Sequence, residues 1–318
     1  MSFLDELVFV PAKMSPLSPS ARPPSASVVF GPRGGVRPVQ AQAPWIVGQT
    51  LPQQAGSQWI DLCTRLSQRG LVLDCPADAL EKVPVTSIPR RLFQQRVNTA
   101  LDMPNLQSAD IVEVTCQSTS RAVWGWPPEI ESSSNLSNWL SAIRRVIGSQ
   151  TPIGLGLNVG CDDQAIQSAC DAETDFLAIH ASSSIELLAH TLGRIRTLRN
   201  QSTNNLTIIV RTNSKSIEHL LKILALGASA VTIDGYLSDL WQATGSSMSS
   251  FLGTRLPTTV PSGPCPIAER LDSIQQKLSE LLASTASNNL NDLGQSLRAL
   301  TPRASQIAAL PMLGDSTT

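Results

Sequence analysis

The sequence predicts a parallel α/β barrel of the (β/α)8 type. Short apolar runs recur along the chain, and segments whose apolar residues have helical spacing separate them. Continuous apolar runs are typical of strands buried on both faces, as in a parallel sheet that helices cover. Right-handed crossovers between such strands leave either an open sheet or a closed barrel. The 318 residues, 42% of them hydrophobic, are enough for one main domain of this kind.

Seven apolar runs are expected to be the strands. A full barrel of this type has eight strands, so one is missing from the count. The missing strand is expected between Ala181 and Gln201, where the fifth run leads directly into a helical pattern. The barrel is therefore expected to be incomplete around strand six. The runs are Trp45–Val47, Leu71–Leu73, Ile111–Val114, Ile153–Val159, Phe176–Ile179, Thr207–Val210 and Ala230–Ile233.

The helices are expected between these runs, where apolar residues recur every three or four positions and a glycine often follows. Glycine at the end of a helix is typical of a left-handed C-terminal cap. The expected helices cover residues 59–66 before Gly70, 135–147 before Gly148, 163–170, 185–198, and 217–224 before Gly227.

Two flanking regions differ from the barrel, which is expected over residues 43–256. Residues 1–42 form an arm that is rich in proline between Pro11 and Pro38, with one short strand expected at Val28–Phe30. Residues 257–318 are expected to form two helices, because leucine and isoleucine recur at helical spacing from Ile267 to Leu281 and from Leu290 to Leu300. These helices are expected to pack on the barrel, and the alternative is contact with a protein partner or a second copy.

Composition excludes several classes of function. The formal charge of −1 leaves no general excess of cations, so no nucleic-acid partner is expected. The longest apolar stretches are far shorter than the roughly 20 residues that cross a bilayer, so we expect a soluble cytoplasmic protein without a membrane span. The six cysteines show no CxxC pair and no metal spacing, so reduced thiols and no metal site are expected.

The candidate site lies where the strands end, because barrels of this type place active sites at the C-terminal ends of their strands. His180 and Asp74 are the proton-transfer candidates, and the alternative for both is hydrogen bonding at the barrel mouth. Arg211 and Lys215 follow the seventh-strand candidate and can attract a phosphate, which the start of the next helix also favours. Against a phosphate stand the lack of paired glycines and the charge of Asp234, and the alternative is a solvated loop.

The order of segments resembles the FMN-binding domain of glutamate synthase and its stand-alone bacterial relatives. Phe3–Pro11 is similar to the family's first segment, Ala43–Gly48 to its first strand, and Leu224–Val231 to its Ala-Leu-Gly-Ala-Asp passage. The resemblance spans most of the chain. It implies a TIM (aldolase-type) barrel, FMN as cofactor and oxidoreductase activity in amino-acid metabolism.

The same resemblance assigns cofactor-binding positions, and most of them depart from the family pattern. The lysine that faces the flavin in the family corresponds to Gly156, and Cys265 is the sole remnant of the cysteines that hold an iron–sulfur cluster, so no cluster is expected. In the loop where the family has Gly-Gln-Gly-Ala-Lys-Pro-Gly, only Gln117 matches. The implied flavin-binding residues are Gly48, Gln49, Thr50, Gln117, Arg211, Thr212, Asn213, Lys215 and Gly235.

Three functions follow as hypotheses, and whether the chain is an enzyme is left open. The first is a degenerate glutamate-synthase-like barrel that has lost FMN and acts as a binding or regulatory protein. The second is an active FMN-dependent oxidoreductase in which Arg211 and Lys215 replace the glycine nest. The third is another barrel enzyme that uses His180 and Asp74 as acid and base on a phosphorylated small molecule, which a pocket joining both to Arg211 would favour.

Overall fold

A computed structural model gives the architecture. It describes residues 2–11, 26–31, 38–47, 66–74, 90–97, 109–116, 133–148, 150–161, 163–172, 174–181, 184–201, 206–240 and 266–315. The fold below refers to these residues.

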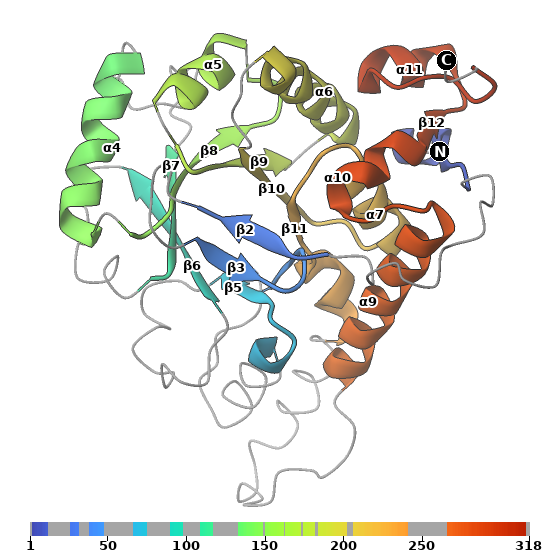
Figure 1. The fold of residues 1–318 in the computed structure, drawn as a ribbon, viewed down its shortest axis with the longest axis horizontal. Coiled ribbons are helices and arrows are strands. Elements are labelled where there is room, and N and C mark those ends of the chain that lie inside the picture. Colours follow the sequence, from blue (N-terminus) through green and yellow to red (C-terminus); the bar gives the residue numbers. More distant parts are fainter. Residues whose placement is uncertain are drawn as a thin grey trace, which may run out of the picture.

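Eight parallel strands close into a barrel, which confirms the predicted fold class (Figure 1). The missing strand is the third, Arg90–Val97, and not the sixth: Phe176–Ala181 pairs directly with Thr207–Thr212, so the barrel has no gap there. The runs expected as strands three, four and five are therefore strands four, five and six. In chain order the barrel strands are β4 (Trp45–Val47), β5 (Val72–Asp74), β6 (Arg90–Val97), β7 (Ile111–Cys116), β8 (Ile153–Asn158), β9 (Phe176–Ala181), β10 (Thr207–Thr212) and β11 (Ala230–Thr232).

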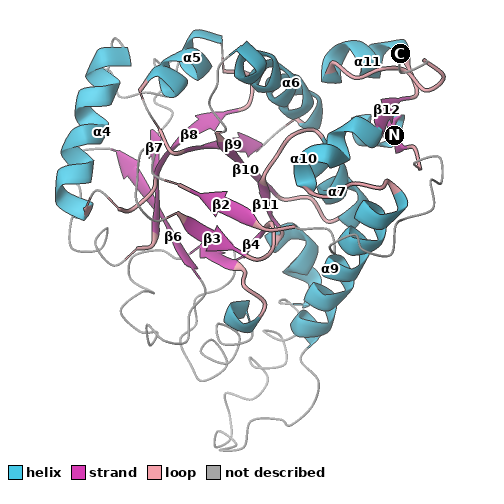
Figure 2. Ribbon diagram, in the orientation of Figure 1, coloured by secondary structure: helices cyan, strands magenta, loops and turns pink. Residues whose placement is uncertain are grey.

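Helices lie outside the strands on the left, upper and right sides of the barrel in Figure 2. They follow the expected apolar spacing, and their buried faces cover the sheet. Gly70, Gly148 and Gly227 have positive φ angles, which places the predicted glycines in the left-handed conformation. The helices between barrel strands are α4 (Ser133–Ile147), α5 (Asp163–Asp171), α6 (Ile185–Gln201) and α7 (Ile217–Ala225).

A short hairpin covers the end of the barrel where the strands begin. Its strands β2 (Val28–Phe30) and β3 (Val39–Ala41) pair in antiparallel fashion, which confirms the strand expected in the arm. The Phe30 ring packs edge to face on Phe176 at the start of β9, with centroids 5.8 Å apart. The hydroxyl of Thr207, at the start of β10, donates to the carbonyl of Val29. This end of the barrel is therefore covered by protein.

Replacing Gly154 by alanine tests the packing at this closed end. A Cβ atom there would lie 2.1 Å from the Phe176 ring, which is itself held by Phe30. We expect a loss of about 1–3 kcal/mol in the free energy of unfolding, because the buried ring must move. Gly193→Ala in α6 is the control: its Cβ would meet Ala308 at an ordinary 3.5 Å. That variant should gain up to about 1 kcal/mol from helix propensity. Urea unfolding measures both, and equal stabilities of the two variants would contradict the prediction.

The C-terminal segments pack on the outside of the barrel next to the N-terminus (Figure 1). Helix α9 (Pro266–Ser284) buries its apolar face, as expected. The second expected helix is wrong beyond Leu293: α10 (Leu290–Leu293) gives way to the 3-10 turn η3 (Gly294–Ser296) and to strand β12 (Leu297–Ala299). This strand pairs with β1 (Leu7–Phe9), which follows the 3-10 turn η1 (Phe3–Glu6). Helix α11 (Pro302–Ala308) follows.

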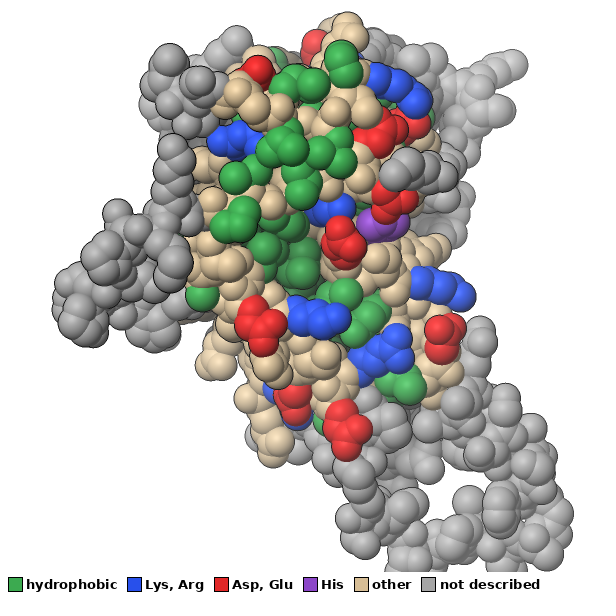
Figure 3. Space-filling view, turned by 90° about the vertical axis from the view of Figure 1, so that its right-hand side faces the viewer, with side chains coloured by type: hydrophobic (Ala, Val, Ile, Leu, Met, Phe, Trp, Pro, Cys, Tyr) green, Lys and Arg blue, Asp and Glu red, His purple; other side chains and the backbone are tan. Residues whose placement is uncertain are grey.

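The N-terminal segment is anchored on α7 by polar contacts. The buried Lys222 ammonium donates to the carbonyl of Leu4 at 2.9 Å and pairs with Glu218. His219 lies 3.1 Å from Asp5. On the face that carries these termini, side chains of both charges are interspersed with apolar ones (Figure 3). The N-terminal segment is thus tied to the outer helix α7.

Candidate functional site

Three charged side chains meet inside the barrel, toward the C-terminal ends of the strands. Arg211 extends from β10, and its guanidinium pairs with Asp74 of β5 and Glu113 of β7. Nε and Nη2 of Arg211 donate to Oε2 of Glu113 at 2.8 and 2.5 Å, while Nη1 donates to Oδ2 of Asp74. Each partner strand is three strands away from β10, in opposite directions around the barrel. The guanidinium therefore crosses the interior.

A histidine connects this charged group to the surface. Nε2 of His180, on β9, lies 2.6 Å from Oε1 of Glu113. The side chain of Glu113 is completely buried, whereas that of His180 keeps 23% of its surface exposed. The structure thus joins His180, Asp74 and Arg211, which the sequence analysis named separately, and adds Glu113 as the residue that bridges them.

Small residues on the inner face leave room for the guanidinium. Glu113 is opposite Gly154 in the register of β7 and β8, and Gly156 is opposite Ala178 one level closer to the mouth. Side chains alternate along a strand, so these positions face the same interior as Glu113. The Phe176 ring fills the space over Gly154, whereas Gly156 and Ala178 contribute almost no volume on the side toward the mouth. The long side chain of Arg211 can therefore lie across the barrel, where larger residues would exclude it.

The two carboxylates of this group differ in acidity. Burial alone would raise the pKa of Glu113, but the charges of Arg211 and His180 outweigh burial and lower its pKa to about 2. Burial raises the pKa of Asp74 above its ordinary value, and Arg211 only partly opposes this because Glu113 and Asp234 add repulsion. For Arg211, burial lowers the pKa, but the two carboxylates outweigh it and raise the pKa. Glu113 is therefore ionised at neutral pH.

The loop after β10 is the phosphate site expected from the sequence. Three backbone donors of this loop and of the helix start are turned toward hydroxyl groups. The N–H of Ser214 donates to Thr212 Oγ1 at 3.3 Å, that of Ser216 to Ser214 Oγ at 3.4 Å, and that of His219 to Ser216 Oγ at 3.4 Å. Ser216 thus caps α7. In this arrangement these three donors serve the helix start and do not point to a free anion site.

The loop after β11 closes on the loop after β10. A Cβ atom at Gly235 would lie 2.3 Å from the carbonyl oxygen of Asn213, so the two backbones are in direct contact. Asp234, beside Gly235, is buried. The two loops that the resemblance implies for the FMN phosphate are thus in backbone contact with each other, and a carboxylate, which repels a phosphate, lies beside them. The residues present do not fit that phosphate group in the arrangement seen.

Of the other predicted flavin-binding residues, Thr212 and Lys215 are described and lie in different environments. Thr212 is buried, and its backbone is held by the hydroxyl of Thr232. The Lys215 side chain is 71% exposed and lies 3.6 Å from Asp239 on the surface. Four predicted positions lie outside the described residues: Gly48, Gln49, Thr50 and Gln117.

Glu113 is the residue that sequence reasoning missed as a functional candidate. It was included in the apolar run Ile111–Val114 and was not considered by itself. A charged residue within a strand that is buried on both faces needs a buried partner, since an unpaired charge there is costly. That rule would have identified Glu113 as a member of a polar site.

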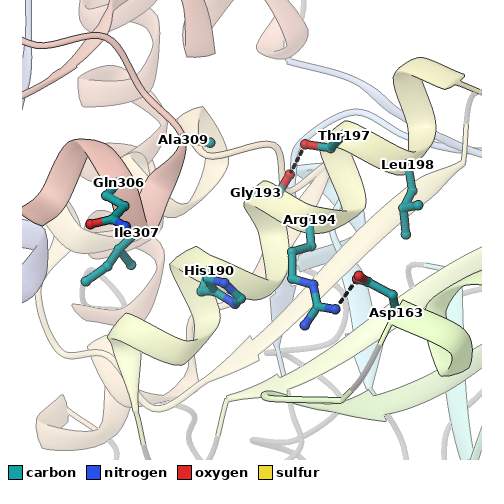
Figure 4. Close-up of a pocket in the computed structure, with 9 residues that line it drawn as sticks. All are labelled: Asp163, His190, Gly193, Arg194, Thr197, Leu198, Gln306, Ile307 and Ala309. Atoms are coloured by element: carbon teal, nitrogen blue, oxygen red, sulfur yellow. Dashed lines mark hydrogen bonds and ion pairs between the residues drawn. The ribbon is translucent and has the colours of Figure 1, made fainter.

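A shallow cleft on the outer helices is separate from this site. It has a volume of about 220 Å³ and lies between α5, α6 and α11 (Figure 4). Arg194 and Asp163 pair with each other at its wall, and His190 lines it. Within the described ranges, no group of side chains is suited to hold a metal ion, and no helix has the length and apolarity to cross a membrane.

The fold and the site together define an α/β barrel with a buried charged group near its C-terminal mouth. No protein-family model and no curated protein sequence matches the chain. Among solved structures it is similar to mandelate oxidase with benzoyl-formic acid, with 12% identity and a TM-score of 0.62 over 93% of this chain and 87% of that chain.

Two structures of a single mandelate oxidase variant show the same similarity. The variant with benzaldehyde has a TM-score of 0.64 at 12% identity, covering 93% of this chain and 87% of that chain. The variant with a C4a-OH-FMN adduct has a TM-score of 0.62 at 13% identity, covering 93% and 89%. At such identities the similarity establishes the fold, a barrel also used by an oxidase seen with FMN.

Proposed function

We propose that the chain binds a small polar molecule at the C-terminal mouth of its barrel and transfers a proton to or from it through His180. The observation that carries this proposal is the 2.6 Å contact between His180 and the buried, ionised Glu113. Barrels of this type carry out their chemistry at this end. An imidazole that combines a carboxylate partner with partial exposure is typical of acid–base catalysis. The resemblance to glutamate synthase, carried by Leu224–Val231, makes descent from a flavin barrel part of the proposal.

Deuterium exchange into simple carbonyl compounds tests the proposal without any cofactor. Purified full-length protein is incubated in D2O with pyruvate, which is charged, or with dihydroxyacetone, which is neutral, and proton NMR follows the exchange. We expect exchange at least about 100-fold faster than with His180→Gln, the usual contribution of a general base. His190→Gln, a change on the outer face of α6, is the matched control and should exchange like the wild type. Equal rates for wild type and His180→Gln on both compounds would overturn the proposal.

An FMN-dependent oxidoreductase of the glutamate synthase type is the second candidate, and the similarity to an oxidase with FMN adducts favours it. Bound FMN would supply hydride chemistry. A visible absorbance spectrum of freshly purified protein, with and without added FMN, separates the candidates. We expect a colourless protein because the Asp234 carboxylate lies beside the loops implied for the phosphate, and these loops contact each other at Asn213 and Gly235. Stoichiometric flavin would favour the oxidoreductase, whereas a colourless protein without exchange would favour a binding or regulatory role.

A further inference from the structure

We infer that Glu113 and Arg211 are positioning residues that fix the tautomer of His180, so that Nδ1 is the atom that exchanges the proton with the ligand. The inference rests on the proposed function, in which His180 meets the ligand. It is carried by the direction of each hydrogen bond in the buried group, which the chemistry of the donors determines.

Arg211 and His180 contact different oxygens of Glu113. A guanidinium has only N–H donors and cannot accept a hydrogen bond. Two of these donors, Nε and Nη2 of Arg211, point to Oε2 of Glu113, and a third holds Asp74. Arg211 is fixed from both sides and is almost completely buried, with 3% of its side chain exposed. Oε2 of Glu113 is therefore held on the side of Arg211, and Oε1 faces His180.

The contact with Glu113 determines which ring nitrogen of His180 carries the proton. The carboxylate of Glu113 is ionised at neutral pH, because its pKa is lowered to about 2, and an ionised carboxylate only accepts hydrogen bonds. Nε2 of His180 must therefore donate at this 2.6 Å contact. A neutral imidazole has a single N–H, so its lone pair is on Nδ1. In the part of the chain that the structure describes, Nδ1 has no hydrogen-bond partner. It is thus the ring nitrogen left for a ligand.

A change of Glu113 to glutamine should invert this arrangement without a change in size. The amide oxygen must take the place of Oε2, since Arg211 offers only donors there. The amide NH2 group then faces His180 and donates to Nε2. An Nε2 atom that accepts a hydrogen bond carries no proton, so the proton moves to Nδ1. An amide in place of a carboxylate has this effect on a catalytic histidine in serine proteases.

Nitrogen NMR of the imidazole rings tests the inference on the full-length protein, at a pH high enough that the rings are neutral. The chain has only three histidines, so His190→Gln and His219→Gln assign the spectrum. We expect the Nε2–H tautomer for His180 in the wild type and the Nδ1–H tautomer in Glu113→Gln. An Nδ1–H tautomer in the wild type would overturn the inference and requires no variant. An unchanged tautomer in folded Glu113→Gln would overturn it as well.

Deuterium exchange into pyruvate and dihydroxyacetone then separates this inference from the proposed function. Glu113→Gln should reduce the exchange by about 100-fold or more, because Nδ1 can no longer act as a base. Inverted tautomers together with unchanged exchange would overturn the role of Nδ1. Expected tautomers in a wild type that shows no exchange would overturn the proposed function and support the fixed tautomer.

Discussion

Replacing Arg211 by methionine is expected to lower the free energy of unfolding by about 3–5 kcal/mol at neutral pH. Methionine fills much of the volume but carries no charge, so Asp74 and Glu113 would remain buried without their shared cation. Two carboxylates that face each other in the interior repel, and each has lost the hydrogen bonds that compensated its transfer from water. The midpoint and slope of urea unfolding, followed by circular dichroism, measure the loss.

Arg303→Met is the matched control for this prediction. Arg303 also pairs with a carboxylate, Glu186 at 2.7 Å, but its side chain is 61% exposed. An exposed pair contributes about 0–1 kcal/mol because water and salt screen it. The two arginines therefore differ mainly in burial. If Arg211→Met lowered the free energy of unfolding no more than Arg303→Met, the burial of Arg211 would not make its ion pairs important for stability.

The strands could be predicted from sequence where burial on both faces produced a continuous apolar run. Strand β6 was not predicted because five of its eight residues are arginine or glutamine, so it contains no continuous apolar run. The missing strand was then placed after Ala181, where the sequence offered no run, but β9 is followed there directly by α6 and pairs with β10. A count of strands does not determine where an unrecognised strand lies.

The end of the chain shows how a distant partner overrides local spacing. The leucines at 290, 293, 297 and 300 have helical spacing, and they predict a helix. In the structure, residues Leu297–Ala299 form a strand because β1, nearly 300 residues earlier in the chain, offers an edge for pairing. The N–H of Leu300 donates to the carbonyl of Glu6, which extends the contact with this edge. Pairing with a strand so distant in the chain produces no local pattern in the sequence.

The candidate site could be predicted in part. His180, Asp74 and Arg211 were identified because each ends a strand, and in a barrel all strand ends face the same mouth. Their assignment to separate roles was an interpretation that the sequence could not test, since the direction of a side chain within a closed barrel depends on register. Glu113 determines how the three are connected, and it lies within a strand and not at its end.

Acid is expected to remove a part of the stability that depends on Glu113. Its pKa falls from 4.5 to about 2 on folding, which corresponds to about 3 kcal/mol as an order of magnitude. A carboxyl group with a lowered folded-state pKa stabilises fully above its unfolded value, so this contribution is present above about pH 4.5 and is lost as the pH falls toward 2. Glu113→Gln should therefore be less stable than the wild type at neutral pH, and the difference should shrink toward pH 2. Urea unfolding across this range measures it.

The ionised carboxylate of Asp74 is expected to change the stability in the opposite direction to that of Glu113. Asp74 therefore provides the internal comparison. Burial raises its pKa, so the ionised form of Asp74 costs stability at neutral pH, and this cost disappears as the pH falls through the raised value. Asp74→Asn should thus be close to neutral or stabilising at pH 7, although Asp74 and Glu113 share the same arginine. Glu186→Gln on the surface should lose no more than about 1 kcal/mol at any pH. A similar loss for Asp74→Asn and Glu113→Gln would show that Arg211 holds both carboxylates equally, which contradicts the asymmetry argued from their burial and charges.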